Sequence, residues 1–145
     1  MASYEQRQTF RLLSYWNSIK EDDKFPDLSE VSLGEMGELW NYCFVLDLTS
    51  PDDPEFTHFG SELISIFGED YTVKKLSDAA IHPVLADVSS FIKEVWLMEA
   101  PVSHCGEVKQ EDEKLLYRSL LAPLSENGDD KIHYLIGTSN FRRAD

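Results

Sequence analysis

The sequence predicts an α+β fold, in which a five-stranded antiparallel sheet carries a central helical insertion and an N-terminal helix packed on the sheet. The first observation is an amphipathic helical pattern at the start of the chain, followed by two short strand patterns. The second is a longer helical pattern from residue 83, followed by three strand patterns separated by turns. The third is a length of 145 residues, which suits one domain.

The N-terminal helix is expected over about residues 4–20. Ser3 and Gln6 have the form of a capping box, in which side chains bind the free N–H groups of the first helical turn. Apolar residues spaced by three and four form one stripe, which comprises Leu12, Leu13, Trp16 and Ile19. Phe10 lies off that stripe, so we expect it at a homodimer interface. We assign residues 1–24 to this helix and its linker, and residues 25–145 to the main part of the same single domain.

The middle of the chain holds short elements. An acidic loop with Pro26 follows the first helix, and two glycines interrupt a weak helical pattern behind it. Residues 42–49, YCFVLDLT, are apolar on both faces, so each face of this strand needs a cover. The turn SPDDPEF leads to a second strand over residues 55–60, and a short helix runs from Ser61 to a break at Gly68.

The second half of the chain begins with a long helix. It is expected from Pro83, which suits the first helical position, to about Ala100. Its apolar residues follow helical spacing at Val84, Val88, Phe91, Ile92 and Val95. Three strands of an antiparallel meander follow, over about residues 102–109, 114–123 and 131–140. Asn127 and Gly128 form a hairpin signal between the last two, because both residues tolerate positive φ.

The chain is strongly acidic. Its 13 lysine and arginine residues stand against 27 aspartate and glutamate residues, for a net charge of −14 at pH 7. Such a chain repels nucleic-acid phosphates and anionic lipids, so neither nucleic acid nor membrane is expected as a partner. No apolar stretch near the start has the length of a signal peptide or membrane span, and we expect a cytoplasmic protein. The acidic clusters lack the pattern of a calcium loop and are interpreted as solvated turns, so no metal is expected.

Three stretches resemble a known family: LLSYWNSIK near the start, FTHFGSELISIFGEDYTVKKLSD at residues 56–78, and LLAPLSENG in the last hairpin. Together with the order of elements they resemble the PAS domain, and more narrowly a branch of small single-domain bacterial PAS proteins, mostly from alphaproteobacteria. The resemblance runs from about Leu12 to Phe141 and makes residues 25–145 a PAS-like domain. It implies a sensing or protein-interaction module that can hold a small ligand between sheet and helices. The chain stops at Asp145, so we expect its output to act in trans on a partner protein.

PAS domains differ in their cofactors, and each cofactor has a residue requirement. Flavin photoreceptors of the family need a Cys in a motif resembling Asn-Cys-Arg-Phe-Leu-Gln, which neither Cys43 in NYCFV nor Cys105 in SHCGE matches. Heme sensors present a His from the long helix, whereas His82 stands just before that helix, at a position that suits a cap or turn residue. Neither flavin nor heme is therefore expected, and the cofactor is left unassigned. Both cysteines are interpreted as unpaired packing residues.

Six residues are candidates for a ligand pocket: Phe91, Ile92, Val95 and Trp96 on the long helix, and Tyr117 and Ser119 on the middle meander strand. Apolar stripes at this spacing are usually core, so the pattern is consistent with a packed interior as well as with an open pocket. Tyr117 and Ser119 offer polar groups that orient a ligand. Strand alternation places Arg118 on the opposite face, but it leaves open which face is buried.

Two functions are compatible with these patterns. The preferred hypothesis is a regulatory or sensory module that binds a partner protein under the control of a small ligand. The alternative is a small-molecule-binding enzyme or carrier that uses the same sheet and helix as a cup, with His104, Cys105 and Tyr117 on adjacent strands. Neighbours on a strand point to opposite faces, so His104 and Cys105 form no catalytic pair unless a bulge at Gly106 reorients one of them. We therefore expect no enzyme.

Overall fold

The computed structural model describes residues 4–31, 33–78 and 81–144. The helical elements are α1 (Tyr4–Lys20), the 3-10 helix η1 (Leu28–Glu30), α2 (Leu33–Met36), the 3-10 helix η2 (Gly37–Tyr42), α3 (Ser61–Phe67) and α4 (Pro83–Met98). The strands are β1 (Phe44–Asp47), β2 (Glu55–Phe59), β3 (Val102–Gln110), β4 (Glu113–Leu124) and β5 (Tyr134–Arg143). Ser3 of the expected capping box lies outside the described residues. Across the described part of the chain, no helix combines the length and apolar character of a membrane span.

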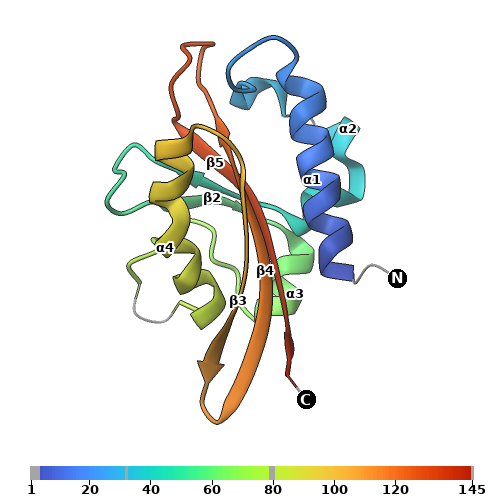
Figure 1. Cartoon of the computed structure of the whole chain (residues 1–145), viewed down its shortest axis with the longest axis vertical. Helices are drawn as coiled ribbons and strands as arrows, with labels where there is room; N and C mark the ends of the chain where they lie inside the picture. Colours follow the sequence, from blue (N-terminus) through green and yellow to red (C-terminus); the bar gives the residue numbers. More distant parts are fainter. Residues whose placement is uncertain (1–3, 32, 79–80, 145) are drawn as a thin grey trace.

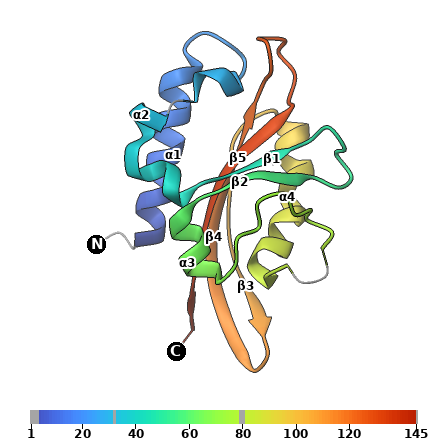
Figure 2. The same ribbon diagram turned by 180° about the vertical axis from the view of Figure 1, so that it is seen from behind.

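The five strands form one antiparallel sheet in the order β2-β1-β5-β4-β3. β1 pairs with both β2 and β5, and β4 lies between β5 and β3. Figure 1 shows α1 on one face of the sheet and α4 on the other, and Figure 2 shows the same two layers from behind. The expected α+β fold, with an N-terminal helix on a five-stranded antiparallel sheet, is confirmed.

The first strand is shorter than the sequence indicates. It covers only Phe44–Asp47 instead of residues 42–49, because Tyr42 still belongs to η2. At the other end, the Asp47 carboxylate accepts hydrogen bonds from the Thr49 backbone N at 2.8 Å and from the Thr49 hydroxyl at 2.6 Å. Such a local side-chain bond turns the chain out of the strand.

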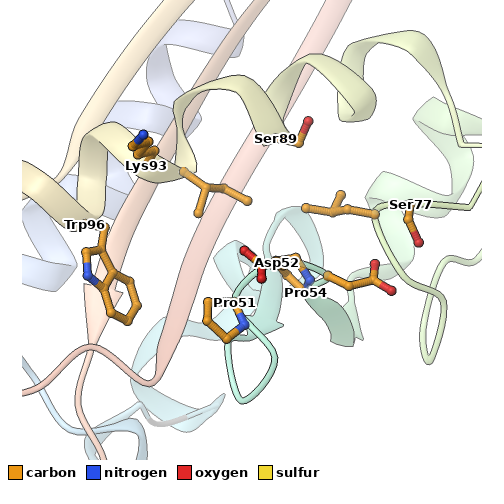
Figure 3. Close-up of a pocket in the computed structure, with 10 residues that line it drawn as sticks. Pro51, Asp52, Pro54, Ser77, Ser89, Lys93 and Trp96 are labelled. Atoms are coloured by element: carbon orange, nitrogen blue, oxygen red, sulfur yellow. The ribbon is translucent and has the colours of Figure 1, made fainter.

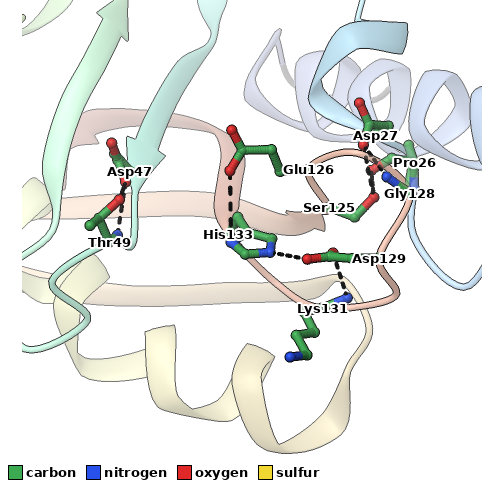
Figure 4. Close-up of polar contacts among 10 residues, drawn as sticks. All are labelled: Pro26, Asp27, Asp47, Thr49, Ser125, Glu126, Gly128, Asp129, Lys131 and His133. Atoms are coloured by element: carbon green, nitrogen blue, oxygen red, sulfur yellow. Dashed lines mark hydrogen bonds and ion pairs between the residues drawn. The ribbon is translucent and has the colours of Figure 1, made fainter.

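The connection between β4 and β5 is longer than a two-residue hairpin. Asn127 and Gly128 take φ values of 57° and 66°, the positive values expected of a turn there. The chain does not enter β5 at once, because the Asp129 carboxylate accepts a hydrogen bond from Lys131 N at 3.1 Å and contacts the His133 ring (Figure 4). As a result, β5 begins later in the chain than the sequence indicates.

α1 covers one face of the sheet with the apolar stripe seen in the sequence. Leu12 and Trp16 are buried, whereas Leu13 and Ile19 are half-buried. The indole Nε1 of Trp16 donates a hydrogen bond to the Pro123 carbonyl of β4 at 2.7 Å. This bond satisfies the polar group of a buried indole and fixes the position of α1 over the sheet.

The face that carries α4 is packed with aromatic rings. The rings of Phe44 and Phe56 meet edge to face with centroids 5.5 Å apart. Phe59 lies 5.3 Å from Tyr71 and 6.0 Å from Phe67, measured between ring centroids. All five side chains are buried. Edge-to-face aromatic packing adds to the stabilisation from buried area, so this part of the interior is filled by the chain itself.

The linker after α1 is tied to the β4–β5 hairpin. Ser125 N donates a hydrogen bond to the Pro26 carbonyl at 2.8 Å. Beside it, the Asp27 carboxylate accepts a hydrogen bond from Gly128 N at 2.8 Å (Figure 4). It also accepts hydrogen bonds from the Ser29 hydroxyl at 2.6 Å and from Ser29 N at 3.0 Å. The bond from the Ser29 hydroxyl is the largest influence on the Asp27 carboxyl, and the pKa of Asp27 is lowered although partial burial opposes the shift.

Asp27→Ala is expected to lower the free energy of unfolding by about 1–2 kcal/mol at pH 7, because η1 loses its N-cap. The pKa of Asp27 is lower in the folded state than the value of about 3.9 for an unfolded Asp. The stabilisation is therefore complete above that pH and disappears as the pH falls through the folded pKa. Urea unfolding over a pH series should show the difference from wild type shrinking below about pH 4. A difference that stays constant at low pH would contradict this account, and Asp22→Ala, in the same linker, is the control.

Candidate functional site

α4 begins at a histidine cap. His82 Nδ1 accepts a hydrogen bond from Val84 N at 3.1 Å, and Pro83 occupies the first turn. The backbone N of His82 donates to the Tyr71 hydroxyl at 3.0 Å, and the His82 ring lies 4.7 Å from the Phe141 ring. Burial lowers the pKa of His82, which favours the neutral imidazole that can accept a hydrogen bond. The interpretation of His82 as a cap residue is confirmed.

α4 presents different surfaces to the sheet and to the outside. Its buried residues are Val84, Leu85, Val88, Phe91 and Val95. Ile92 is half-buried and Trp96 is 44% exposed. The helix therefore separates an interior site from an outer one.

Three linked polar side chains lie on the inner side of α4: Tyr117 is buried, whereas Asp87 and His104 are half-buried. The Tyr117 hydroxyl of β4 donates a hydrogen bond to the Asp87 carboxylate of α4, and His104 Nδ1 of β3 lies 2.9 Å from the same hydroxyl. The ring of Phe91 lies 5.0 Å from the ring of His104. Burial, and after it the hydrogen bond to Asp87, raises the pKa of Tyr117, so the phenol is neutral at physiological pH. One shared hydroxyl thus connects α4 to two strands.

Ser119 lies on the same side of β4 as Tyr117, because residues two apart on a strand share a face. Its hydroxyl oxygen is 2.7 Å from the hydroxyl oxygen of Ser139 on β5, and both side chains are buried. Two buried hydroxyls that bond to each other satisfy their need for partners. The face that holds Tyr117 and Ser119 is thus the buried face toward α4, which the sequence left open.

A groove runs along the outer side of α4, between the helix and the β1–β2 loop (Figure 3). Its first part has a volume of about 650 Å³, and its wall includes Pro51, Asp52, Pro54, Leu76, Ile92 and Trp96. Its second part has a volume of about 500 Å³, and its wall includes Leu48, Pro51, Trp96, Glu99, Asp130 and Ile132. Pro51 and Trp96 belong to both parts, so the two hollows adjoin each other. We call this feature the outer groove.

The six side chains predicted to form a pocket lie on two sides of α4. Phe91, Val95, Tyr117 and Ser119 are buried on the inner side. Ile92 and Trp96 line the outer groove. The structure therefore divides the predicted set between the interior and the outside.

Sequence reasoning missed the opposite wall of the outer groove. The sequence predicts only a turn at Pro51, Asp52 and Pro54. No local pattern indicates that this turn faces a helix about forty residues later in the chain. The prolines and aspartates of the turn are the only signal that the sequence offers for these residues, and that signal is not specific to a site.

The end of α4 is apolar and exposed. Trp96, Leu97 and Met98 are 44%, 72% and 60% exposed. We call these three residues the apolar end of α4. Exposed apolar side chains gathered at one helix end are available for contact with another protein. Phe10 is also exposed, at 70%, but it lies on α1 across the sheet.

The two cysteines have different environments. Both are free, and burial raises the pKa of the Cys43 thiol. Cys105 is exposed, so the interpretation as a packing residue is wrong for this position. The β3–β4 ladder continues through Gly106 without a register shift, and strand alternation directs Cys105 away from the face of His104. Within the described ranges, no three or more His, Cys, Asp or Glu side chains are grouped so that they can hold a metal ion.

Comparison with known proteins identifies one family. The family model described as PAS domain matches residues 4–138. Among solved structures, the PAS domain of histidine kinase ThkA is 15% identical with a TM-score of 0.50, and the match covers 68% of this chain and 96% of that one. The PAS domain from Bordetella pertussis BvgS is 14% identical with a TM-score of 0.44, over 67% and 71% of the two chains. A search of the curated proteins found no match.

Proposed function

Because the chain belongs to the PAS domain family, we propose that it is a regulatory module that acts in trans by binding a partner protein. PAS domains are sensory and regulatory modules, and they are generally sensory rather than catalytic. They commonly mediate protein interactions and dimerise. Our proposal goes beyond what the family implies in three respects: action in trans, a specific protein partner and control by a ligand.

The apolar end of α4 is the observation that carries the proposal. Its three side chains stand out of the fold at the last turn of a helix whose other apolar residues are mostly buried. Removing such side chains from water stabilises a complex, and tryptophan is enriched among the residues that contribute most to binding. The apolar end of α4 therefore suits a protein contact.

A photo-crosslinking amino acid in place of Leu97 is expected to capture one partner protein in cells that produce the chain naturally. The same amino acid in place of Asp112, in the exposed β3–β4 turn, is the control and should give no adduct. The Leu97 adduct should diminish strongly when Trp96 is also replaced by alanine. No adduct at Leu97, or the same adduct from both positions, would contradict the proposal.

We also propose that a small ligand controls the module. One observation supports a ligand. On the inner side of α4, the Tyr117 hydroxyl joins polar groups of α4, β3 and β4, and a few polar groups among apolar side chains are typical of small-molecule sites. Native mass spectrometry and an absorption spectrum of the same sample provide the test. Extra mass that disappears on denaturation is expected, and a bare mass with no visible band would contradict a bound ligand.

We further propose that the chain forms a homodimer through α1. The support is Phe10, which is 70% exposed on the outer face of a helix whose apolar stripe already packs on the sheet. Sedimentation analysis is expected to show a dimer that Phe10→Ala shifts toward the monomer. A wild-type chain that remains monomeric at high concentration would rule this interface out.

A further inference from the structure

The outer groove is long and open, and three separate segments build it. α4 forms one wall, the β1–β2 loop the other, and residues 130–133 before β5 close its far part. Figure 3 shows Trp96 at one end of the helix wall, with Pro51 and Asp52 of the loop facing the helix. Because the two hollows adjoin at Trp96 and Pro51, their shape suits an elongated segment of a partner better than a compact molecule.

The floor of the outer groove is apolar. Leu48, Leu76 and Ile132 contribute side chains that are only 5%, 8% and 8% exposed, so they present small apolar areas from within the fold. The Trp96 side chain belongs to both hollows and is 44% exposed, so its ring offers apolar surface to an occupant. An occupant therefore gains most from an apolar side chain placed against Trp96 and Pro51.

The walls carry charged side chains of both signs. They carry Asp52, Asp53, Glu99 and Asp130 against two lysines, Lys93 and Lys131. Glu99 is paired with Lys24 at 2.8 Å and Asp53 Oδ2 with Lys75 at 3.8 Å. Asp52, Asp130 and the two wall lysines take part in no ion pair within the described residues, so the unpaired wall charges balance and the sign of the field depends on the charge of the whole chain. The whole chain adds the field of a net charge of −14, which attracts cationic partners.

Building on the partner binding proposed above, we propose that the outer groove binds a cationic amphipathic segment of the partner protein. The segment places an apolar side chain against Trp96 and Pro51, and lysine or arginine side chains beside Asp52 and Asp130. A second copy of this chain is a poorer occupant of the groove, because it has only 13 lysine and arginine residues against 27 aspartate and glutamate residues to place beside Asp52 and Asp130.

The probe is a fluorescein-labelled helical peptide of leucine and lysine, with a matched peptide in which glutamate replaces every lysine. Fluorescence anisotropy with the full chain at low salt is expected to show binding of the lysine peptide only. Trp96→Ala should weaken that binding at least about fivefold, as for a central contact residue. Asp52→Asn and Asp130→Asn should each weaken it about twofold to fivefold and reduce its salt dependence.

Matched controls separate the groove from general charge and apolar effects. Asp112→Asn removes one exposed carboxylate outside the groove, and Val73→Ala truncates a 74% exposed apolar side chain that does not line it; both should bind the lysine peptide as wild type does. Circular dichroism confirms that each variant is folded. Equal losses in control and groove variants, or binding of both peptides, would overturn the proposal.

The crosslinking experiment distinguishes failure of this inference from failure of the proposed function. If Leu97 still captures a protein and the adduct survives the double variant Asp52→Asn, Asp130→Asn, partner binding stands and the cationic segment is wrong. If Leu97 captures nothing, the proposed function itself fails. If the groove variants change the mass of the free chain in sedimentation, a second copy occupies the groove and the inference is also wrong.

Discussion

Trp16→Ala is expected to lower the free energy of unfolding by about 3–5 kcal/mol, the range for removal of a large buried aromatic side chain. Trp16 is 4% exposed at the contact between α1 and β4, so its removal leaves a cavity that the sheet cannot close. The Pro123 carbonyl also loses the indole donor at 2.7 Å. Urea unfolding followed by circular dichroism measures the effect.

Two further variants divide this effect into its causes. Trp16→Phe keeps most of the apolar volume but removes the donor, and we expect a loss of about 1–3 kcal/mol. Phe10→Ala truncates an exposed ring on the same helix and should change the stability of the monomer by less than about 0.5 kcal/mol. A Trp16→Ala variant as stable as Phe10→Ala would mean that α1 does not pack on the sheet in solution.

Gly60→Ala is expected to lower the free energy of unfolding by more than about 3 kcal/mol, or to prevent folding, because the added methyl group has no space. A Cβ atom at this position would lie 2.2 Å from the Asn41 carbonyl oxygen and 2.8 Å from the Trp40 carbonyl oxygen. Both are backbone atoms of η2 and cannot rotate away. Gly60 N also donates to the Cys43 carbonyl at 2.9 Å, which holds the close approach in place.

Gly37→Ala is the matched control for Gly60→Ala. Gly37 has a φ of 55°, and a Cβ there would meet nothing within 4 Å. Gly37→Ala is expected to lower the free energy of unfolding by only about 1–2 kcal/mol, because its sole effect is strain of a left-handed backbone. Urea unfolding of both variants compares the free energy lost to the steric clash at Gly60 with the free energy lost to backbone strain at Gly37. Equal losses would show that the contact between Gly60 and η2 is absent or compliant in solution.

Sequence patterns accounted for the elements whose signals are local. Helical spacing over Leu12 and Trp16 identified α1, Pro83 marked the start of α4, and Asn127 with Gly128 marked the last turn. These features depend on side-chain periodicity and on backbone preferences of single residues, which operate within a few positions along the chain. The order of such elements was enough to indicate the α+β fold.

The site depended on contacts that no local pattern contains. Helical spacing gave Phe91, Ile92, Val95 and Trp96 equal weight, yet Phe91 and Val95 are buried and Ile92 and Trp96 line the outer groove. Which side of the helix faces water follows from the placement of the sheet and of the β1–β2 loop. The same limit applied to Cys105, whose exposure depends on β3 being the last strand of the sheet.

The polar contacts are the features that local sequence patterns predict least. Tyr117 meets Asp87 and His104 from three different elements, and Ser119 meets Ser139 across two strands. Asp53 and Trp96 come to one groove from positions more than forty residues apart. Contacts at such separations depend on how the packed layers are placed relative to one another, because only packing brings those segments together. Composition and periodicity therefore indicate the fold and its charge, and the arrangement of chemical groups appears only in the folded chain.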